Sequence, residues 1–381
     1  MKRVNQDLDT TNPIRILVVT DFGLEVPGGA QLVAKNLMLS MSERGHHCEL
    51  ICYSDNYSRV GIARHLRRIG LIAKAFELRG ILNPLGCIRF SSACRSFKPD
   101  VIWFHNINNE WSWFILLLGF RGARKFITFH DLTAISRLKV EPKAYSEAAK
   151  IYWKRNFTQR VRNSYIRFTL RNVTSVAIGA GVSAILQENR IRVDGSIPNT
   201  VEPCNHENLL LPRINNSVLF AGRENLKGLA QIARAVALEE DWVLYLAGDP
   251  DLLEKASFFC PIGRIIYLGK MNRKDLLKWI HNVEYVAVLS QYFDNYPTIA
   301  LEAIVHGAIP LTTSATGVST IVRELGEQLV LEPEEIPNLS KIKLATSVEP
   351  VALNRLKNEI SNQRSQVDAY LKLFHESLNQ E

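Results

Sequence analysis

Short apolar runs rich in Val, Ile and Leu alternate with longer amphipathic stretches along most of the chain. In the first half these runs predict strands at residues 16–20, 49–52, 101–104, 126–129 and 173–178. Strands that alternate with helices form parallel sheets that are covered by helices on both faces. The first half is therefore predicted to be a doubly wound α/β domain.

A second series of the same kind follows a segment rich in asparagine and proline at residues 197–216. The predicted strands of this series are residues 218–220, 243–246, 265–268, 285–289 and 309–311. Since 381 residues exceed one ordinary domain, we expect two doubly wound α/β domains in tandem, at residues 1–202 and 203–349. Residues 350–381 are predicted to form one long helix that packs across the molecule.

The composition excludes several other classes of protein. Hydrophobic residues make up 46% of the chain and charged residues 22%, as in soluble globular proteins. No apolar stretch precedes Ile14, so no secretory signal is predicted and we expect a cytoplasmic protein. The longest apolar run, residues 111–120, has about half the length of a membrane-spanning helix. The six cysteines are dispersed without zinc-site spacing, which indicates reduced core thiols.

Positive charge is concentrated in the first half. Residues 1–200 contain 29 Lys and Arg against 15 Asp and Glu, whereas residues 201–381 contain 17 against 23. This asymmetry predicts that the first half contacts an anionic surface. Basic and apolar residues alternate through residues 59–79, as in a helix that lies on a membrane, and a second basic stretch with aromatic residues runs through 139–171. Either stretch can instead be a solvated helix face. Because no nucleic-acid-binding motif accompanies the charge, we expect an anionic membrane and no nucleic acid.

A pair of glycines follows the first predicted strand. Gly28 and Gly29 lie in the loop DFGLEVPGGAQ, directly before the start of a helix. Glycines at such a place let backbone amides approach an anion at the positive end of the helix dipole, although a tight turn without a ligand is the alternative. The loop lacks the spacing G-x-G-x-x-G, which disfavours a nicotinamide dinucleotide.

In the second half, the strand SVLFAG leads directly into RENLKG. This places Arg223 and Lys227 at the carboxyl end of a strand, the edge where open α/β sheets bind their ligands. A forked guanidinium and a compact ammonium four residues apart suit a diphosphate, and a solvated loop is the alternative. At the end of the strand FITF, His130 holds a similar position, where a lone histidine can also be structural.

The segment SQYFDNYPTIALEAIVHGAIP is the most informative in the chain. A helix that begins near Thr298 has Asp294 in the preceding loop and Glu302 in its first turns, while residues 295–298 present backbone amides at its amino terminus. Glu302 is flanked by apolar residues and therefore needs a partner. A ribose diol can donate two hydrogen bonds to it, and a structural Arg or Lys is the alternative.

Together, these segments resemble the family-4 retaining glycosyltransferases of the GT-B fold. The resemblance runs from RILVVT through PGGAQ, FITFHD, IPNTVE, FAGRENLKG and IIYLGKM to DNYPTIALEAIVHG, and so covers most of the chain. It implies two Rossmann-like domains that face a cleft, with a C-terminal helix that crosses back. The second domain would bind most of a nucleotide-sugar donor, and the first would bind the acceptor.

The resemblance also implies roles for the residues that match the motifs of the family. Arg223 and Lys227 would bind the donor diphosphate, which Gly28 and Gly29 would approach from the first domain. Glu302 would take the ribose hydroxyls.

The remaining implied roles concern the transferred sugar and the base. His130 and Asp294 would be the catalytic residues at the sugar. Further donor contacts would come from Lys270 and Met271 at the base, and from Asn295, Tyr296, Pro297 and Thr298 at the sugar and phosphate.

The activity that the resemblance implies is retaining transfer from a nucleotide-diphosphate sugar, without a metal or cofactor. The acceptor would be a lipid-linked glycan or polysaccharide, and the enzyme would be peripheral on the inner face of the cell membrane. Two other functions fit the same residues. Because Asp294 stands where glutamate is usual and the phosphate loop is one residue short, a catalytically silent nucleotide-sugar-binding subunit is the main alternative. A GT-B epimerase is the third.

Overall fold

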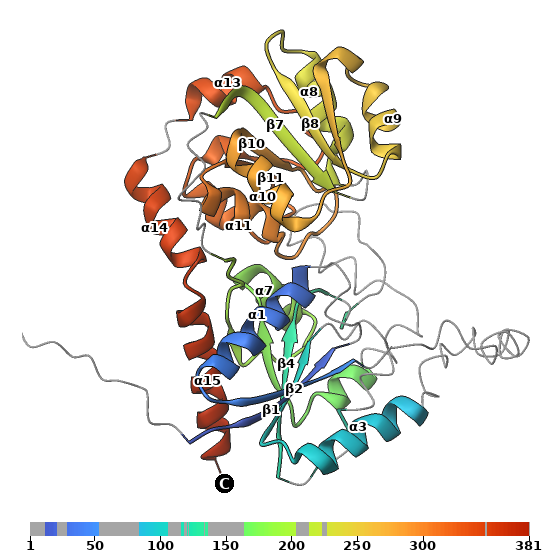
Figure 1. The fold of residues 1–381 in the computed structure, drawn as a ribbon, viewed down its shortest axis with the longest axis vertical. Coiled ribbons are helices and arrows are strands. Elements are labelled where there is room, and N and C mark those ends of the chain that lie inside the picture. Colours follow the sequence, from blue (N-terminus) through green and yellow to red (C-terminus); the bar gives the residue numbers. More distant parts are fainter. Residues whose placement is uncertain are drawn as a thin grey trace, which may run out of the picture. The chain divides into compact units, whose positions relative to one another are not determined.

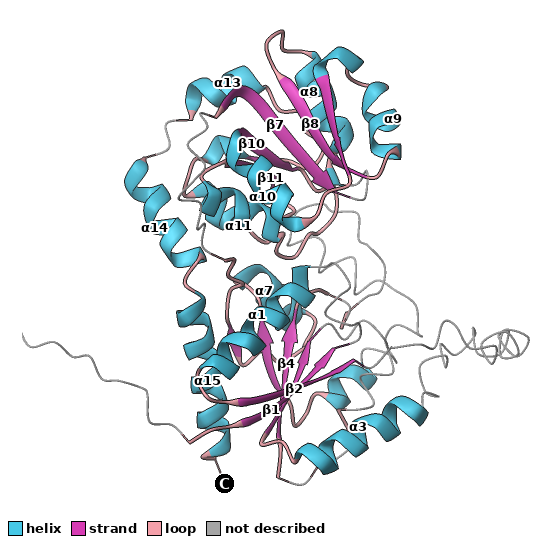
Figure 2. Cartoon of the chain, viewed as in Figure 1, coloured by secondary structure: helices cyan, strands magenta, loops and turns pink. Residues whose placement is uncertain are grey.

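The computed structural model describes residues 12–20, 29–52, 84–105, 116–117, 120, 122–132, 134–135, 164–202, 213–222, 227–346 and 349–380. The described residues form two parallel sheets of six strands each, both flanked by helices (Figures 1 and 2). The tandem α/β organisation that the sequence predicts is therefore confirmed. All ten predicted strands are present, and each sheet gains one short edge strand of two residues.

The first sheet belongs to the amino-terminal half and has the order β2-β1-β3-β4-β5-β6. Its strands are β1 (Arg15–Thr20), β2 (His47–Cys52), β3 (Val101–His105), β4 (Arg124–Phe129), β5 (Thr174–Ala177) and β6 (Gly195–Ser196). The helices with this half are α1 (Gly29–Glu43), α3 (Pro84–Phe97) and α7 (Ala180–Glu188). Strand β3 is buried along its whole length, as its continuous apolar sequence predicts for a central parallel strand.

The second sheet has the order β12-β11-β10-β7-β8-β9, which is the strand order of dinucleotide-binding folds. Its strands are β7 (Ile214–Gly222), β8 (Val243–Gly248), β9 (Ile265–Gly269), β10 (Val283–Val288), β11 (Ile309–Thr313) and β12 (Val330–Leu331). The direction in which strands are added reverses between β7 and β10. Ligands of such sheets bind at the carboxyl ends of the two strands on either side of this reversal.

Helices cover both faces of the second sheet. They are α8 (Leu229–Ala237), α9 (Asp251–Ser257), α10 (Arg273–Asn282), α11 (Thr298–His306), α12 (Ser319–Arg323) and α13 (Leu339–Ala345). Helix α8 packs against α9, and α10 packs against α11. Because crossovers between parallel strands are right-handed, the reversal of strand order puts these two pairs on opposite faces.

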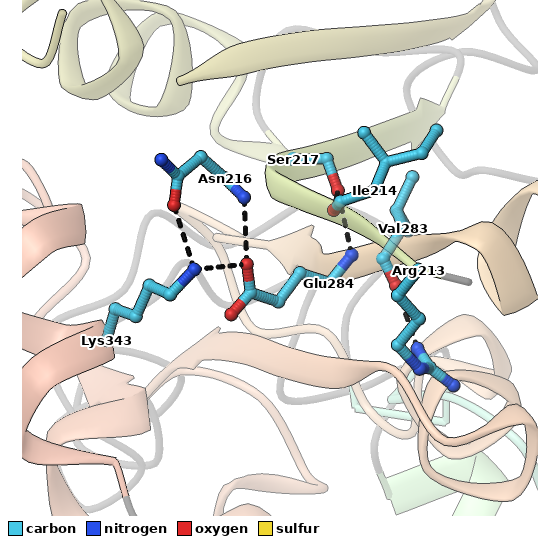
Figure 3. A network of polar contacts seen from close by, with 7 residues as sticks. All are labelled: Arg213, Ile214, Asn216, Ser217, Val283, Glu284 and Lys343. Atoms are coloured by element: carbon cyan, nitrogen blue, oxygen red, sulfur yellow. Dashed lines mark hydrogen bonds and ion pairs between the residues drawn. The ribbon is translucent and has the colours of Figure 1, made fainter. Parts of the chain in front are cut away.

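A polar network ties together the amino-terminal ends of β7 and β10 (Figure 3). The Lys343 ammonium donates to Asn216 Oδ1 at 2.8 Å and to Glu284 Oε2 at 2.9 Å. The backbone N–H of Asn216 also donates to Glu284 Oε2, at 2.9 Å. The Arg213 guanidinium donates to the carbonyls of Val283 and His306. The network lies at the end of the sheet opposite to the ligand-binding edge, so we assign it a structural role.

Residues 350–378 form two helices, and not one. The predicted single helix is interrupted after Ile360, where α14 (Pro350–Ile360) ends, and α15 (Gln363–Leu378) begins after two intervening residues. The side chain of Asn362 accepts from the Ser365 amide, and this local bond competes with a continuous helix. Polar residues in the segment SNQ therefore start a new helix at a place where helical periodicity alone predicts continuation.

The described residues divide into two compact units, one within residues 1–129, 161–176 and 367–381 and one within residues 130–160 and 177–366. Helix α14 packs against α11 in the second unit. In the first unit, Tyr370 and Phe374 of α15 pack against Trp103 with ring centroids 4.6 and 5.4 Å away. Trp103 donates to Thr128 Oγ1 at 2.9 Å, and this hydroxyl lies 3.2 Å from the Tyr370 hydroxyl. The end of the chain thus completes the core of the amino-terminal sheet.

Candidate functional site

An ion pair lies at the point where the strand order of the second sheet reverses. The Lys227 ammonium is 3.2 Å from Asp294 Oδ2, and the two side chains are 31% and 16% exposed. Lys227 follows β7 and Asp294 follows β10, and these strands are hydrogen-bonded neighbours. The pair therefore occupies the edge where this class of sheet binds ligands, and it remains accessible to solvent.

Gly228 explains how Lys227 can approach β10 so closely. Its φ is +89°, a conformation that favours glycine, and a Cβ atom there would lie 2.3 Å from both Cβ and the carbonyl oxygen of Leu289. Any other residue would push the turn away from the end of β10. The glycine that follows Lys227 in RENLKG is thus required by the local packing.

The loop that carries Asp294 is fastened to the neighbouring strand ends. The Ser290 hydroxyl donates to Asp294 Oδ2 at 3.0 Å, and the Thr313 hydroxyl donates to the Ser290 carbonyl at 2.7 Å. The Asp294 backbone donates to Ala315 and accepts from Gly317. These contacts fix the carboxylate in one position, as a group that acts on a substrate requires.

The amino terminus of α11 lies directly after this loop. Pro297 is its N-cap residue and makes no side-chain capping bond. The Ala300 amide donates back to the Pro297 carbonyl, which leaves the amides of Thr298 and Ile299 without a partner within the helix. Tyr296 is buried, and burial raises the pKa of its hydroxyl. Asn295 Oδ1 is buried and has no hydrogen-bond partner among the described residues. The arrangement suits an anion at the helix terminus, with polar groups beside it.

Glu302 lies one turn into α11 and is paired with Arg273, the first residue of α10. The Arg273 Nη1 donates to Glu302 Oε1 at 2.7 Å, and the glutamate side chain is 4% exposed. Burial raises the pKa of the Glu302 carboxyl, and the negative charge of Glu202 adds to that rise, while Arg273 and a hydrogen bond from Thr298 oppose it. The structure therefore contains the alternative that the sequence analysis left open, a structural arginine as the partner of Glu302. The carboxylate can still accept further hydrogen bonds.

Lys270 and Met271 follow β9, next to this pair along the chain. The Lys270 ammonium is 76% exposed and lies 3.0 Å from Asp249 Oδ1, which follows β8. Asn272 then caps α10 by accepting from the Asp275 amide. The segment after β9 thus leads directly into Arg273.

His130 follows β4 at the carboxyl end of the amino-terminal sheet, as the sequence predicts. Its side chain is 8% exposed, and burial lowers the pKa of the imidazole to about 3. The ring is therefore neutral at physiological pH. A neutral imidazole can donate one hydrogen bond and accept another, which suits contact with a hydroxyl better than contact with an anion.

Several predicted site residues lie outside the described part of the chain. These are Arg223, Gly28, the basic stretch at 59–79 and most of that at 139–171. Gly29 is the first residue of α1, so the predicted helix start is confirmed. Arg167 and Arg171, from the end of the second basic stretch, lie among the described residues, where Arg167 is half-buried and Arg171 is exposed. Within the part of the chain that the structure describes, no helix is long and apolar enough to cross a membrane.

Sequence reasoning did not single out Arg273, Ser290 or Thr313. The sequence does contain information that could have identified Arg273, because a cation at the first position of a helix opposes the helix dipole and needs an acidic partner. Nothing in the sequence singles out Ser290 or Thr313, because hydroxyl residues at strand ends are common. Their hydrogen-bond partners depend on the order of the strands in the sheet.

Comparisons with known proteins agree with this architecture. The family model described as Glycosyltransferase Family 4 matches residues 27–191, and that described as Glycosyl transferases group 1 matches residues 203–348. A search of curated proteins returned no match.

Solved structures with the same fold cover almost the whole chain. A sucrose-phosphate synthase from Thermosynechococcus elongatus has a TM-score of 0.69 at 16% identity, covering 96% of this chain and 100% of its own. A glycosyltransferase from Rickettsia africae ESF-5 has a TM-score of 0.66 at 17% identity, with 97% and 100% covered. The Anabaena protein HepE in complex with UDP-glucose has a TM-score of 0.65 at 13% identity, with 95% and 99% covered.

Two tandem Rossmann-like sheets and the two family matches define the class of protein: this is a glycosyltransferase of the GT-B fold. The two matches together cover most of the chain. It belongs to the family-4 glycosyltransferases, as the resemblance of the motifs predicted.

Proposed function

We propose that the protein is a retaining glycosyltransferase that moves a sugar from a nucleotide-diphosphate sugar to a lipid-linked or saccharide acceptor in surface-glycan synthesis. The observation that carries the proposal is the Lys227–Asp294 pair, which lies at the sheet's ligand-binding edge directly before the amino terminus of α11. A cation and unpaired helix amides together suit a diphosphate. The HepE structures, solved with UDP and with UDP-glucose, support a nucleotide sugar as the donor class.

In this proposal the leaving diphosphate is stabilised by Arg223, Lys227 and the backbone amides of Asn295, Tyr296 and Thr298, since Pro297 has no N–H to donate. The bond between the sugar C1 and the phosphate oxygen breaks, and its electron pair passes to the diphosphate. Preorganised cations and amides at that oxygen lower the barrier without a metal. Gly28 and Gly29 would approach the same phosphate. The acceptor oxygen would attack C1 on the face that the diphosphate leaves, and the proton of the acceptor hydroxyl would pass to the departing phosphate oxygen.

Two residues would act at the transferred sugar. Neutral His130 would exchange hydrogen bonds with a sugar hydroxyl, and Asp294 would accept from another while it balances the charge of Lys227. Hydroxyl contacts that strengthen as positive charge develops on the sugar ring contribute to the rate. Lys270 and Met271 would contact the base, and Glu302 would take the ribose hydroxyls.

The acceptor side is proposed to work at the cytoplasmic face of the cell membrane. The excess of Lys and Arg in residues 1–200 supports an anionic surface as the partner of that half. Half-buried Arg167 and exposed Arg171 contribute to this charge among the described residues. We propose no nucleic acid as a partner.

The donor and the reaction can be tested in two steps. A thermal-shift panel of UDP-, GDP- and ADP-sugars should identify one donor that raises the melting temperature. Incubation of that donor with membrane extract should then transfer sugar with the anomeric configuration retained. Stabilisation without transfer would favour the silent binding subunit, whereas conversion of the donor without acceptor would favour an epimerase.

The membrane partner has a separate test. Replacing Arg64, Arg67, Arg68 and Lys74 with Gln should release the protein from anionic vesicles, since each basic residue near a charged leaflet contributes about 1 kcal/mol. Raised salt should act in the same way. Transfer to a soluble acceptor should survive in the variant. Wild-type protein that stays in the supernatant at low salt would contradict membrane attachment.

A further inference from the structure

The contact between Arg273 and Glu302 joins two parts of the donor site that are 29 residues apart in sequence. Arg273 starts α10, directly after the segment proposed to contact the base, and Glu302 lies in α11. The Nη1 to Oε1 distance of 2.7 Å is that of a charge-assisted hydrogen bond. Arg273 is about one third exposed, whereas Glu302 is almost completely buried.

The part of α11 that carries Glu302 is buried, which disfavours the ionised form of its carboxylate. Ala300, Leu301, Ala303 and Ile304, which flank Glu302 in the sequence of α11, are fully buried, and Glu302 itself is 3% exposed. An unpaired carboxylate in such a place takes up a proton, because burial penalises the charged form. Arg273 supplies the opposite charge that offsets this effect, and its own position at the start of α10 is opposed by the helix dipole.

The carboxylate keeps capacity for a ligand after these contacts are made. An ionised carboxylate has about four acceptor positions. Arg273 and Thr298 use two of them. The two acceptor positions that remain match the two hydroxyls of a ribose, which can both donate to an ionised carboxylate. A protonated carboxyl group would instead present its own O–H to one of these hydroxyls.

We propose that Arg273 is a positioning residue that holds the Glu302 carboxylate ionised and in place, and thereby makes the donor site select ribonucleotides over 2′-deoxyribonucleotides. The inference rests on the proposed function, in which Glu302 binds the ribose. Arg273 also has a buried Nε without a hydrogen-bond partner among the described residues, so a bound nucleotide can satisfy a further donor at this place.

The test compares the affinities of UDP and 2′-deoxy-UDP, and of GDP and 2′-deoxy-GDP, by titration calorimetry. The variants are Arg273→Met, Arg273→Lys and Glu302→Gln. Arg323→Gln is the control, because Arg323 also pairs with a glutamate, Glu327, but belongs to α12 and not to α10 or α11. Wild-type protein and the control should prefer the ribonucleotide about tenfold or more, because a site built to bind a hydroxyl rejects an analogue without it. Arg273→Met and Glu302→Gln should both reduce the preference to about twofold or less, and Arg273→Lys should restore part of it.

A pH series separates positioning from general support of the fold. In Arg273→Met the lost cation lets the pKa of Glu302 rise further, so the preference for ribose should return as the pH increases from 6 to 9. Wild-type protein should show a smaller change over this range. A purely structural role of Arg273 would not make ribose selection depend on pH.

The outcomes distinguish failure of this inference from failure of the proposed function. Equal loss of affinity for UDP and 2′-deoxy-UDP in Arg273→Met, with the preference unchanged, would overturn the role of Arg273 while Glu302→Gln still supports ribose binding. Wild-type preference that survives Glu302→Gln would overturn the ribose assignment itself. Wild-type protein that binds no nucleoside diphosphate would overturn the proposed function and the inference together.

Discussion

The Lys227 ammonium and the Asp294 carboxylate lie 3.2 Å apart although 67 residues separate them in the chain. They meet because β7 and β10 are neighbours at the reversal of strand order, and both residues follow the carboxyl ends of these strands. In the proposed donor site, Asp294 would therefore determine how much positive charge Lys227 presents to the diphosphate. The two residues should have opposite effects on donor affinity.

Lys227→Gln should weaken binding of the nucleoside diphosphate about tenfold or more, because a hydrogen bond to a charged group contributes about 1.5 to 3 kcal/mol. Titration calorimetry measures the affinity directly. Lys255→Gln is the matched control, since Lys255 pairs with an aspartate on α9 and is 42% exposed. Unchanged affinity in Lys227→Gln would show that the ammonium does not contact the diphosphate.

Asp294→Asn should leave the affinity for the nucleoside diphosphate equal or higher, because it removes the negative charge beside Lys227 while it keeps the shape of the side chain. Sugar transfer should fall on the order of a hundredfold, since the carboxylate no longer stabilises the reacting sugar. Calorimetry and a transfer assay give the two values. Weaker nucleotide binding with normal turnover would contradict the catalytic role of Asp294.

Glu302→Gln and His130→Ala should differ in steady-state kinetics. A ribose contact is the same in the ground and transition states, so the loss of Glu302 should raise KM more than it lowers kcat. A contact to the transferred sugar strengthens in the transition state, so the loss of His130 should lower kcat more. If His130→Ala altered KM alone, its placement at the sugar would be wrong.

The stability of the protein should depend on pH through His130. Burial lowers the pKa of His130 from its usual 6.5 to about 3, so between these values the unfolded chain binds a proton that the folded chain does not. The contribution of His130 to stability is therefore complete above pH 6.5 and is lost as the pH falls, by up to about 1.4 kcal/mol per pH unit. Burial lowers the pKa values of His46 and His375 as well, and they act in the same direction.

The measurement is the melting temperature between pH 7.5 and 5. In His130→Asn the midpoint should fall less steeply on acidification than in wild-type protein. His47→Asn, at an exposed position next to buried His46, is the control and should keep the wild-type slope. A slope in His130→Asn that equals that of wild-type protein would show that the imidazole of His130 is protonated as easily in the folded chain as in the unfolded one.

Phe374→Ala should destabilise the amino-terminal unit by about 3 to 5 kcal/mol, because Phe374 is fully buried and its ring lies 4.6 Å from Phe126 and 5.4 Å from Trp103. Chemical denaturation followed by tryptophan fluorescence measures the loss. Lys372→Ala, two residues earlier on the exposed face of α15, should cost little. Equal stability of the two variants would contradict the role of α15 in this core.

The sequence by itself determined the strands of both sheets, the α/β class and the family. Runs such as ILVVT and VIWFH are buried on both faces, and a parallel strand in that position needs a continuous apolar sequence. The ends of these strands were also predictable, because the glycine, proline and polar residues that terminate them act locally. Lys227 and His130 could therefore be placed at carboxyl strand ends, and Asp294 in the loop before a helix, ahead of any tertiary structure.

Only the tertiary structure decided which of these residues meet. Lys227 and Asp294 come together through the order β11-β10-β7-β8, and Arg273 reaches Glu302 through the packing of α10 on α11. The break at Ser361 and Asn362 likewise separates two helices whose apolar faces pack in different compact units. Hydrophobic periodicity specifies which face of an element is buried, but not the element against which it packs. The ion pairs Lys227–Asp294 and Arg273–Glu302 depend on how the elements pack, because charged side chains at strand and helix ends interact only after the cores have set their positions.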